Sequence, residues 1–212
     1  LADETVAAIM LEPIQSMAGV RMAQPDFYRS LRALCDERGI VLIYDEVQTG
    51  VGRTGEWFFA ASEVGDHVVP DIVTLAKALG SGVPVGACLV NESIASCIKE
   101  NDLGTTFGGG MLAMAAVTAT LEAIENDGML ENVRRVEGYL RERVPESRRV
   151  HGRGFLLGIE SEENAAAVHK RLLERKIITG TSSNPKVLRL LPPLCLREEH
   201  VDEFISATDE RG

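Results

Sequence analysis

Residues 40–45 read Ile-Val-Leu-Ile-Tyr-Asp, and residues 71–77 read Asp-Ile-Val-Thr-Leu-Ala-Lys. Each stretch is a short apolar run that ends in an ionisable side chain. Continuous apolar runs of this length are typical of strands buried in a parallel sheet, and ligands of open α/β sheets bind at the carboxyl ends of such strands. We therefore expect Asp45 and Lys77 to share one crevice.

Strand and helix patterns alternate around these two runs. Residues 6–11 read as an earlier buried strand, and residues 26–37 carry apolar side chains at helical spacing, with Phe27 on the apolar face, Arg32 on the outer face and Gly39 at the end. Further patterns predict a short helix at 56–61, a strand at 85–90, and helices at 92–99 and 111–126. Such alternation predicts an α/β fold.

The pattern changes near residue 128. A charged amphipathic helix is predicted at 130–144, followed by strands at 150–151, 155–159 and 187–190 and by helices at 164–176 and 198–210. We therefore predict that residues 1–127 are part of a large domain and that residues 128–212 form a small carboxyl-terminal α+β domain. Because the first strand follows Leu1 almost at once and has no earlier partner, we also expect an amino-terminal portion to precede it.

The composition narrows the classes of partner. The 212 residues include 32 acidic and 22 basic side chains, for a formal charge of −10, which argues against nucleic acid or anionic lipid as the main partner. No apolar run reaches the roughly 18 residues that a membrane span needs, and no signal peptide pattern opens the chain. We expect a cytoplasmic protein without a membrane partner. Its four cysteines lack metal or disulfide spacing, so we expect no metal site and reduced, mostly buried thiols.

The candidate chemistry lies at the two strand ends. Taken alone, Lys77 reads as an ordinary loop lysine and Asp45 as a turn cap. Together they match the needs of pyridoxal phosphate, which uses a lysine for its aldehyde and a carboxylate for its pyridine nitrogen. The run Thr105-Thr106-Phe107-Gly108-Gly109-Gly110 offers hydroxyls and amides for a phosphate, or is a flexible turn. Arg189 reads as a carboxylate clamp or as a solvent-facing strand residue.

Several motifs, in order, resemble the class III aminotransferases, the pyridoxal 5'-phosphate enzymes that include acetylornithine, ornithine and 4-aminobutyrate aminotransferases. The matching stretches are Glu-Pro-Ile-Gln at 12–15, Asp-Glu-Val-Gln-Thr-Gly at 45–50, Gly-Arg-Thr-Gly at 52–55, Lys-Ala-Leu-Gly at 77–80 and Thr-Thr-Phe-Gly-Gly at 105–109. The resemblance covers essentially the whole chain. It implies the aspartate aminotransferase fold (fold type I), with a mainly parallel large-domain sheet flanked by helices, a small α+β domain, and no amino-terminal half.

The resemblance also implies roles for individual residues. Lys77 is similar to the Schiff-base lysine that also moves the substrate proton, and Asp45 to the partner of the pyridine nitrogen. The other implied roles are ring packing for Val47, a hydrogen bond to the phenolic oxygen for Gln48, phosphate binding in the neighbouring subunit for Thr106 with Thr105, substrate α-carboxylate binding for Arg189, and a place near the cofactor for Glu12.

The implied activity is transfer of an amino group between an amino donor, an amine or (ω-)amino acid, and a 2-oxo acid acceptor, in a homodimer with shared active sites. One departure concerns the substrate, because ornithine-type members carry a second glutamate where this chain has Met17, and methionine cannot pair with Arg189. Another pyridoxal phosphate reaction on the same fold (aminomutase, racemase or epimerase, decarboxylase) stays open, as does a non-catalytic fragment or subunit.

Overall fold

The protein is described here from a computed structural model that covers residues 5–62, 65 and 67–209. The described chain forms two compact units. Unit 1 contains the residues up to Pro13 together with Ala23–Val51 and Glu56–Asn126, and unit 2 contains Ile14–Met22, Gly52–Gly55 and the residues from Asp127 onward. Two short early segments therefore belong to unit 2, which no pattern in the sequence indicates.

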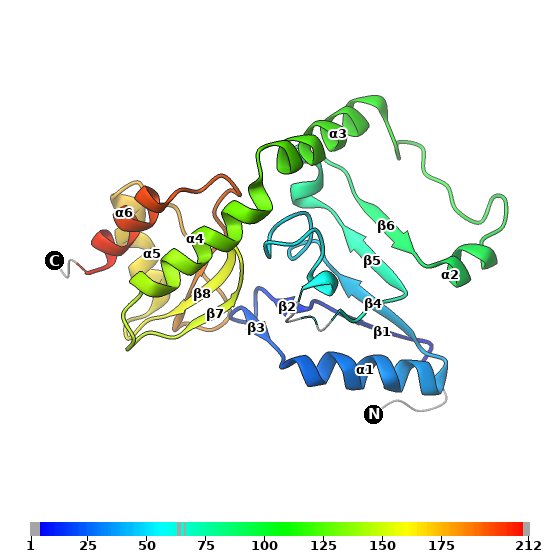
Figure 1. The fold of residues 1–212 in the computed structure, drawn as a ribbon, viewed down its shortest axis with the longest axis horizontal. Helices are drawn as coiled ribbons and strands as arrows, with labels where there is room; N and C mark the ends of the chain where they lie inside the picture. The colour runs from blue at the N-terminus through cyan, green and yellow to red at the C-terminus, as the bar shows by residue number, and fades with distance from the viewer. Residues whose placement is uncertain (1–4, 63–64, 66, 210–212) are drawn as a thin grey trace. The chain divides into compact units, whose positions relative to one another are not determined.

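Unit 1 is built on a four-stranded sheet. The order is β1 (Ala8–Leu11), β4 (Val41–Asp45), β5 (Ile72–Leu75) and β6 (Ala87–Val90), which Figure 1 shows side by side. The first three strands run parallel, and β6 pairs with β5 in the antiparallel direction. The short connection from β5 to β6 explains this reversal, because a parallel neighbour needs a longer crossover. The sheet fits the predicted α/β class.

Helix α1 (Pro25–Arg38) begins with its proline in the first turn and ends at Gly39, which has a left-handed φ of 62°. The predicted apolar face of this helix is partly wrong. Phe27 is 49% exposed, whereas the neighbouring Tyr28 is fully buried, and its hydroxyl donates to the Pro13 carbonyl at 2.7 Å. Adjacent helical residues point about 100° apart, so a buried acceptor for the phenol selects which aromatic side chain turns inward.

Asp71 joins α1 to the sheet. Its Oδ2 accepts from the Leu42 N–H at 2.8 Å and from Arg32 Nη1 at 2.9 Å, and its Oδ1 accepts from Asn91 Nδ2 at 2.8 Å. Burial acts to raise the pKa of Asp71, but these hydrogen bonds outweigh it and hold that pKa below its ordinary value. Arg32 is therefore half-buried and ion-paired, which corrects its predicted place on the outer face of the helix.

The rest of unit 1 consists of two single-turn 3-10 segments and two helices: η1 (Phe59–Ala61), η2 (Lys77–Gly80), α2 (Glu92–Cys97) and α3 (Met111–Asn126). The predicted helices at 56–61 and 92–99 are therefore shorter than expected. Asn91 caps α2 because its side-chain oxygen accepts from the Ile94 N–H at 2.9 Å. Helix α3 packs against η2, which begins with the candidate lysine.

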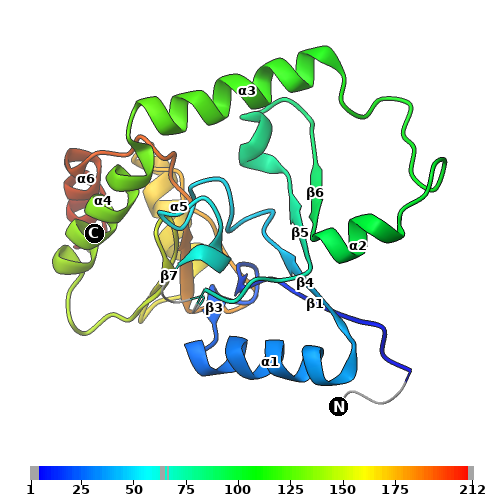
Figure 2. The ribbon, with the colours of Figure 1, turned by 45° about the vertical axis from the view of Figure 1, so that its right-hand side comes forward.

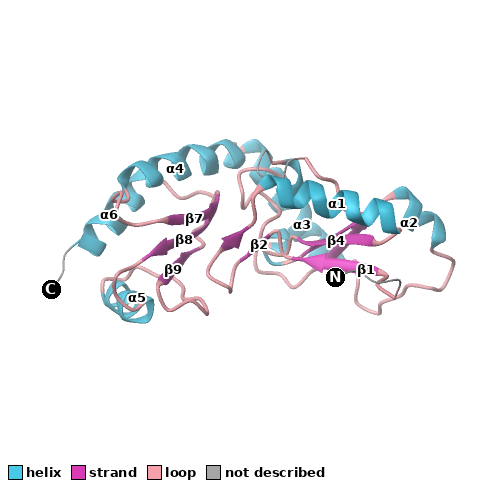
Figure 3. Ribbon diagram, turned by 90° about the horizontal axis from the view of Figure 1, so that it is seen from below, coloured by secondary structure: helices cyan, strands magenta, loops and turns pink. Residues whose placement is uncertain are grey.

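Unit 2 contains an antiparallel sheet of β7 (Val150–Arg153), β8 (Leu156–Glu160) and β9 (Val187–Leu190). Figure 3 shows these strands beside α4 (Met129–Arg143), α5 (Ala165–Glu174) and α6 (Glu198–Asp209). The predicted last residue of α6, Glu210, lies outside the described residues. A two-stranded ribbon of β2 (Ile14–Gln15) and β3 (Arg21–Met22) also belongs to this unit, and the sequence analysis did not predict it. The buried core draws on α4, α5, α6, β8 and β9.

The cysteines differ from expectation. Cys35 is buried, but Cys88, Cys97 and Cys195 are exposed, so the prediction of mostly buried thiols is wrong. All four are free thiols. Across residues 5–62, 65 and 67–209, no group of His, Cys, Asp and Glu side chains could hold a metal ion. In the same part of the chain, no helix is both long and apolar enough to span a bilayer.

Candidate active site

The candidate site lies at the carboxyl ends of β1, β4 and β5. In the sheet register Leu11 lies opposite Tyr44, and Asp45 lies opposite Thr74. Glu12, directly after Leu11, is therefore level with Asp45. Lys77 follows Thr74 by three residues. The structure thus places Asp45 at the carboxyl end of β4 and Lys77 two residues after the carboxyl end of the adjacent parallel strand β5, at the edge of the sheet where ligands of α/β proteins bind.

The Asp45 carboxylate is oriented through one of its two oxygens. Its Oδ1 accepts from the Val47 N–H at 3.0 Å and from the Thr74 hydroxyl at 3.4 Å. Among the residues that the structure describes, Oδ2 has no hydrogen-bond partner. The side chain is half-buried. It can therefore accept a further hydrogen bond from a positively charged donor.

Lys77 has an unusual backbone conformation. The sequence pattern predicts Lys77 at the end of a strand, but β5 ends at Leu75 and Lys77 is the first residue of η2, with a φ of +44°. A left-handed φ costs a non-glycine residue about 1 kcal/mol or more, and such strain collects at functional sites. The turn is held by the Leu79 N–H, which donates to the Ala76 carbonyl at 3.0 Å, and by the buried Leu79 side chain.

The Lys77 amine is exposed and forms neither a hydrogen bond nor an ion pair with any described residue. The exposure of the amine agrees with the alternative that Lys77 is an ordinary loop lysine. A free amine on a strained, packed turn is also available to react with an aldehyde. Gly80 is needed for the packing of this turn, because a Cβ there would lie 2.6 Å from Val85 Cγ1.

Glu46 anchors the loop that follows Asp45. It is 1% exposed, and its Oε2 accepts from the Phe59 N–H at 2.6 Å and from the Thr49 hydroxyl at 3.1 Å, while its Oε1 accepts from the Ala60 N–H at 3.3 Å. Burial raises the pKa of Glu46, and these hydrogen bonds only partly oppose the rise. No sequence pattern predicted a role for Glu46. Its position next to Asp45 could have indicated this role. Successive side chains of a strand point to opposite faces, so Glu46 points away from the face that Asp45 occupies.

Val47 and Gln48 are both half-buried in the turn that Glu46 anchors. The Gln48 amide has no hydrogen-bond partner within the described residues, so it remains available to a ligand. Thr105 and Thr106 are exposed in the segment between α2 and α3. Figures 1 and 2 show the segment between α2 and α3 looping outward from the sheet, and no described hydrogen bond joins either threonine to Asp45 or Lys77.

Arg189 lies in β9 of unit 2. Its Nη1 donates to the Ser16 hydroxyl at 2.8 Å, and its Nε is buried without a hydrogen-bond partner. Its backbone exchanges hydrogen bonds with Gly180 at 2.7 and 2.8 Å. The guanidinium is half-buried and anchored at one nitrogen, so it is not the solvent-facing strand arginine that remained an alternative.

Arg53 is a second arginine of unit 2 that contacts the strands around Arg189, and no sequence pattern indicated this role. It lies in the Gly52–Gly55 segment of unit 2, and its Nη1 donates to the Phe155 carbonyl at 3.3 Å and to the Pro192 carbonyl. Burial lowers the pKa of Arg53 to about 10. Since Phe155 precedes β8 and Pro192 follows β9, Arg53 ties together the ends of the two strands that carry Arg189 and its neighbour Gly158.

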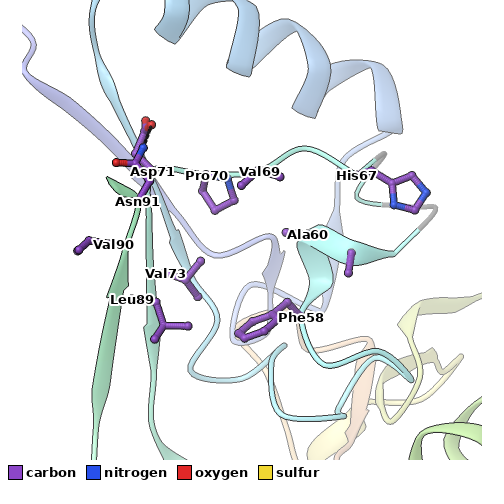
Figure 4. A pocket seen from close by; sticks show the side chains of 11 residues that line it. Phe58, Ala60, His67, Val69, Pro70, Asp71, Val73, Leu89, Val90 and Asn91 are labelled. Carbon is purple, nitrogen blue, oxygen red and sulfur yellow. Dashed lines mark hydrogen bonds between the residues drawn. The ribbon is translucent and has the colours of Figure 1, made fainter. Parts of the chain in front are cut away.

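A cavity in unit 1 lies away from the predicted residues. It has a volume of about 430 Å³ and is mostly apolar. Figure 4 shows Phe58, Val73 and Leu89 facing it, with Asp71 and Asn91 at one end. Asp71 precedes β5, so this cavity lies toward the amino end of that strand, and none of the predicted site residues lines it.

The donor set in unit 1 fits pyridoxal phosphate. The group needs an amine for its aldehyde and a carboxylate for its ring nitrogen. Lys77 supplies a free amine and Asp45 a free carboxylate oxygen at one sheet edge, and Gln48 adds a free amide. The fold and the site thus define an α/β protein suited to an aldehyde cofactor.

Comparisons with known proteins give the family. The model of the class-III aminotransferase family matches residues 1–210, and the chain belongs to this family, whose members depend on pyridoxal phosphate. The chain is 44% identical to an acetylornithine aminotransferase of Methanocaldococcus jannaschii and 41% identical to one of Aquifex aeolicus. Each alignment covers 99% of this chain, but only 53% and 55% of the respective relatives. The chain therefore spans about half the length of these relatives.

Solved structures agree with this assignment. An ornithine delta-aminotransferase of Plasmodium falciparum superposes with a TM-score of 0.84 at 32% identity, over 96% of this chain and 55% of that one. An acetylornithine aminotransferase of Elizabethkingia anophelis gives a TM-score of 0.85 at 30% identity, over 96% of this chain and 53% of the other. The α/β fold of this chain therefore matches that of pyridoxal phosphate aminotransferases.

Proposed function

We propose that this chain carries the cofactor lysine of an aminotransferase that exchanges an amino group between an amine or (ω-)amino acid and a 2-oxo acid. The observation that supports this most is that Asp45 ends β4 and Lys77 follows the carboxyl end of the adjacent parallel strand β5, at one edge of the sheet. Family membership and the match to solved aminotransferases support it independently.

Lys77, Asp45, Val47 and Gln48 have distinct functions in this proposal. When bound, pyridoxal phosphate withdraws electrons from the carbon that bears the amino group. Lys77 holds the cofactor through its amine and, once displaced by substrate, carries the proton to and from that carbon. Asp45 accepts the hydrogen bond of the protonated ring nitrogen. Val47 packs on the ring, and Gln48 donates to the phenolic oxygen.

The remaining predicted residues complete the proposal. Glu12 lies at the same sheet edge as Asp45 and belongs to the surroundings of the cofactor. Arg189 binds the carboxylate of the substrate. Thr106, with Thr105, lies in an exposed segment, and we propose that it binds the cofactor phosphate of a neighbouring subunit in a homodimer with shared sites.

The proposal includes a domain division and a location. Residues 1–127 form part of the large cofactor-binding domain, and residues 128–212 form the small carboxyl-terminal domain. The cytoplasmic location expected from the sequence stays a prediction.

The test is to add pyridoxal phosphate and to follow absorption in the near-visible range. We expect a band that survives dialysis, disappears on borohydride reduction and is absent from Lys77→Ala. Lys99→Ala is the matched control, because Lys99 is also exposed and its amine has no partner among the described residues. A wild-type protein that never shows the band would refute cofactor binding by this chain. A band that no amino donor converts would leave cofactor binding and refute transamination.

A further inference from the structure

We propose that Thr74 is a positioning residue, which orients the Asp45 carboxylate for the ring nitrogen of the cofactor. This inference rests on the proposed function, which assigns Asp45 to that nitrogen. The Thr74 hydroxyl donates to Asp45 Oδ1 at 3.4 Å, and the two residues lie opposite each other in the pairing of β4 with β5. Because they are paired in register, their side chains share one face of the sheet.

Both hydrogen bonds of the Asp45 side chain go to one oxygen. Oδ1 accepts from the Val47 N–H at 3.0 Å and from the Thr74 hydroxyl, whereas Oδ2 has no hydrogen-bond partner among the residues that the structure describes. The Val47 N–H belongs to the turn that directly follows Asp45, so it moves with the carboxylate. Of the two donors, only Thr74 lies on another strand, and its hydroxyl therefore fixes the carboxylate relative to the sheet.

The backbone of Thr74 is held from both sides. Its carbonyl accepts from the Glu46 N–H at 3.0 Å, and β5, which contains Thr74, lies between β4 and β6, where Thr74 pairs with Cys88. Threonine is also β-branched, so few rotamers are open to its hydroxyl. A donor on such a central strand holds its acceptor more precisely than a donor on a loop would.

Thr74 also links the two ionisable residues of the candidate site. It precedes Lys77 by three residues on the chain that leaves β5, and its hydroxyl contacts the carboxylate at the end of β4. The amine and the carboxylate are thereby held to the same strand. Loss of the hydroxyl would leave the Asp45 carboxylate freer to rotate and would weaken its pairing with a protonated ring nitrogen, while the Lys77 amine would stay in place.

The test compares two forms of the cofactor that differ at the ring nitrogen. Equilibrium dialysis of wild type, Thr74→Val and Thr74→Ser would give the Kd for pyridoxal phosphate and for its analogue with a C–H group in place of that nitrogen. Valine keeps the shape of threonine without the hydroxyl, and serine keeps the hydroxyl. We expect Thr74→Val to raise the Kd for pyridoxal phosphate about fivefold, which corresponds to about 1 kcal/mol, and to leave the Kd for the analogue unchanged. Thr74→Ser should bind both forms as the wild type does.

Equal changes in the two Kd values, or no change in either, would overturn the inference, as would a Thr74→Ser protein that behaves like Thr74→Val. If circular dichroism shows that Thr74→Val does not fold, Thr74→Ser and Thr74→Ala form a second pair that differs by the hydroxyl, with the same expected direction and the same refuting results. The near-visible cofactor band separates this test from that of the proposed function. A wild-type protein without the band refutes both proposals, whereas a wild type with the band and equal Kd changes in the variants refutes only the role of Thr74.

Discussion

Replacing Glu46 by alanine tests the anchor of the loop that carries Asp45 and Gln48. The substitution removes the acceptor of the Phe59 N–H at 2.6 Å, of the Ala60 N–H at 3.3 Å and of the Thr49 hydroxyl. An unsatisfied buried donor costs about 1–3 kcal/mol, and relief of the desolvated carboxylate offsets part of this sum. We therefore expect Glu46→Ala to lower the free energy of unfolding by about 3 kcal/mol.

The assay for this prediction is urea unfolding followed by circular dichroism. Glu46→Gln keeps one oxygen for the Phe59 N–H and the Thr49 hydroxyl and turns its amide toward the half-buried Ala60 N–H, so we expect a loss of about 1–2 kcal/mol. Glu122→Ala is the control, because Glu122 is exposed and has no partner among the described residues, and it should change stability by less than about 0.5 kcal/mol. If Glu46→Ala unfolds within about 1 kcal/mol of the wild-type protein, the anchoring argument is wrong.

Two further predictions concern stability, and a third concerns carboxylate binding. Asp71 has a depressed pKa in the folded protein, so its contribution is present above the unfolded value of about 3.9 and is lost as pH falls through the folded pKa. Urea midpoints of Asp71→Asn and wild type should therefore differ at pH 7 and approach each other as the pH falls below about 3.9. Gly154→Ala should lower the free energy of unfolding by more than about 3 kcal/mol, because its Cβ would lie 2.4 Å from the Arg53 carbonyl. Gly128→Ala is the control: it has nearly the same φ and no atom within 4 Å, so it should cost only about 1 kcal/mol in backbone strain. Equal thermal unfolding of the two variants would contradict this prediction. Arg53→Met should raise the Kd for succinate, a non-reacting carboxylate that probes the proposed role of Arg189, several-fold and leave the cofactor band unchanged, because Arg53 joins the ends of β8 and β9 and β9 carries Arg189. An unchanged Kd by titration calorimetry would show that Arg53 does not position Arg189.

Local signals were sufficient for the features that depend on neighbouring residues in the chain. Gly39 was predicted to end the helix at 26–37, and its left-handed backbone at the end of α1 confirms the prediction. The apolar runs that end at Asp45 and Lys77 were predicted to be buried parallel strands whose carboxyl ends share one crevice, because each run is continuous and short. Both strands are observed, in parallel and in adjacent positions.

Features that depend on a distant partner could not be predicted in this way. Tyr28 rather than Phe27 is buried because the Pro13 carbonyl lies within reach of its hydroxyl. Arg32 turns inward because Asp71, 39 residues away, accepts from it. In each case a hydrophobic or charge pattern assigns a face to the helix, but the hydrogen-bond partner decides which side chain occupies it.

Two stretches that contain candidate site residues pass from one unit to the other. The chain passes from unit 1 to unit 2 after Pro13 and again after Val51, so Glu12 is followed within four residues by Ser16, and Gln48 within five by Arg53. In each of these two stretches, 12–16 and 48–53, the first part belongs to the candidate cofactor edge, and the second part contacts Arg189 or the ends of β8 and β9. A substitution in the second part should therefore alter carboxylate binding while the Lys77 band persists. That separation of effects is what distinguishes a motif with two local functions from one that merely completes the fold.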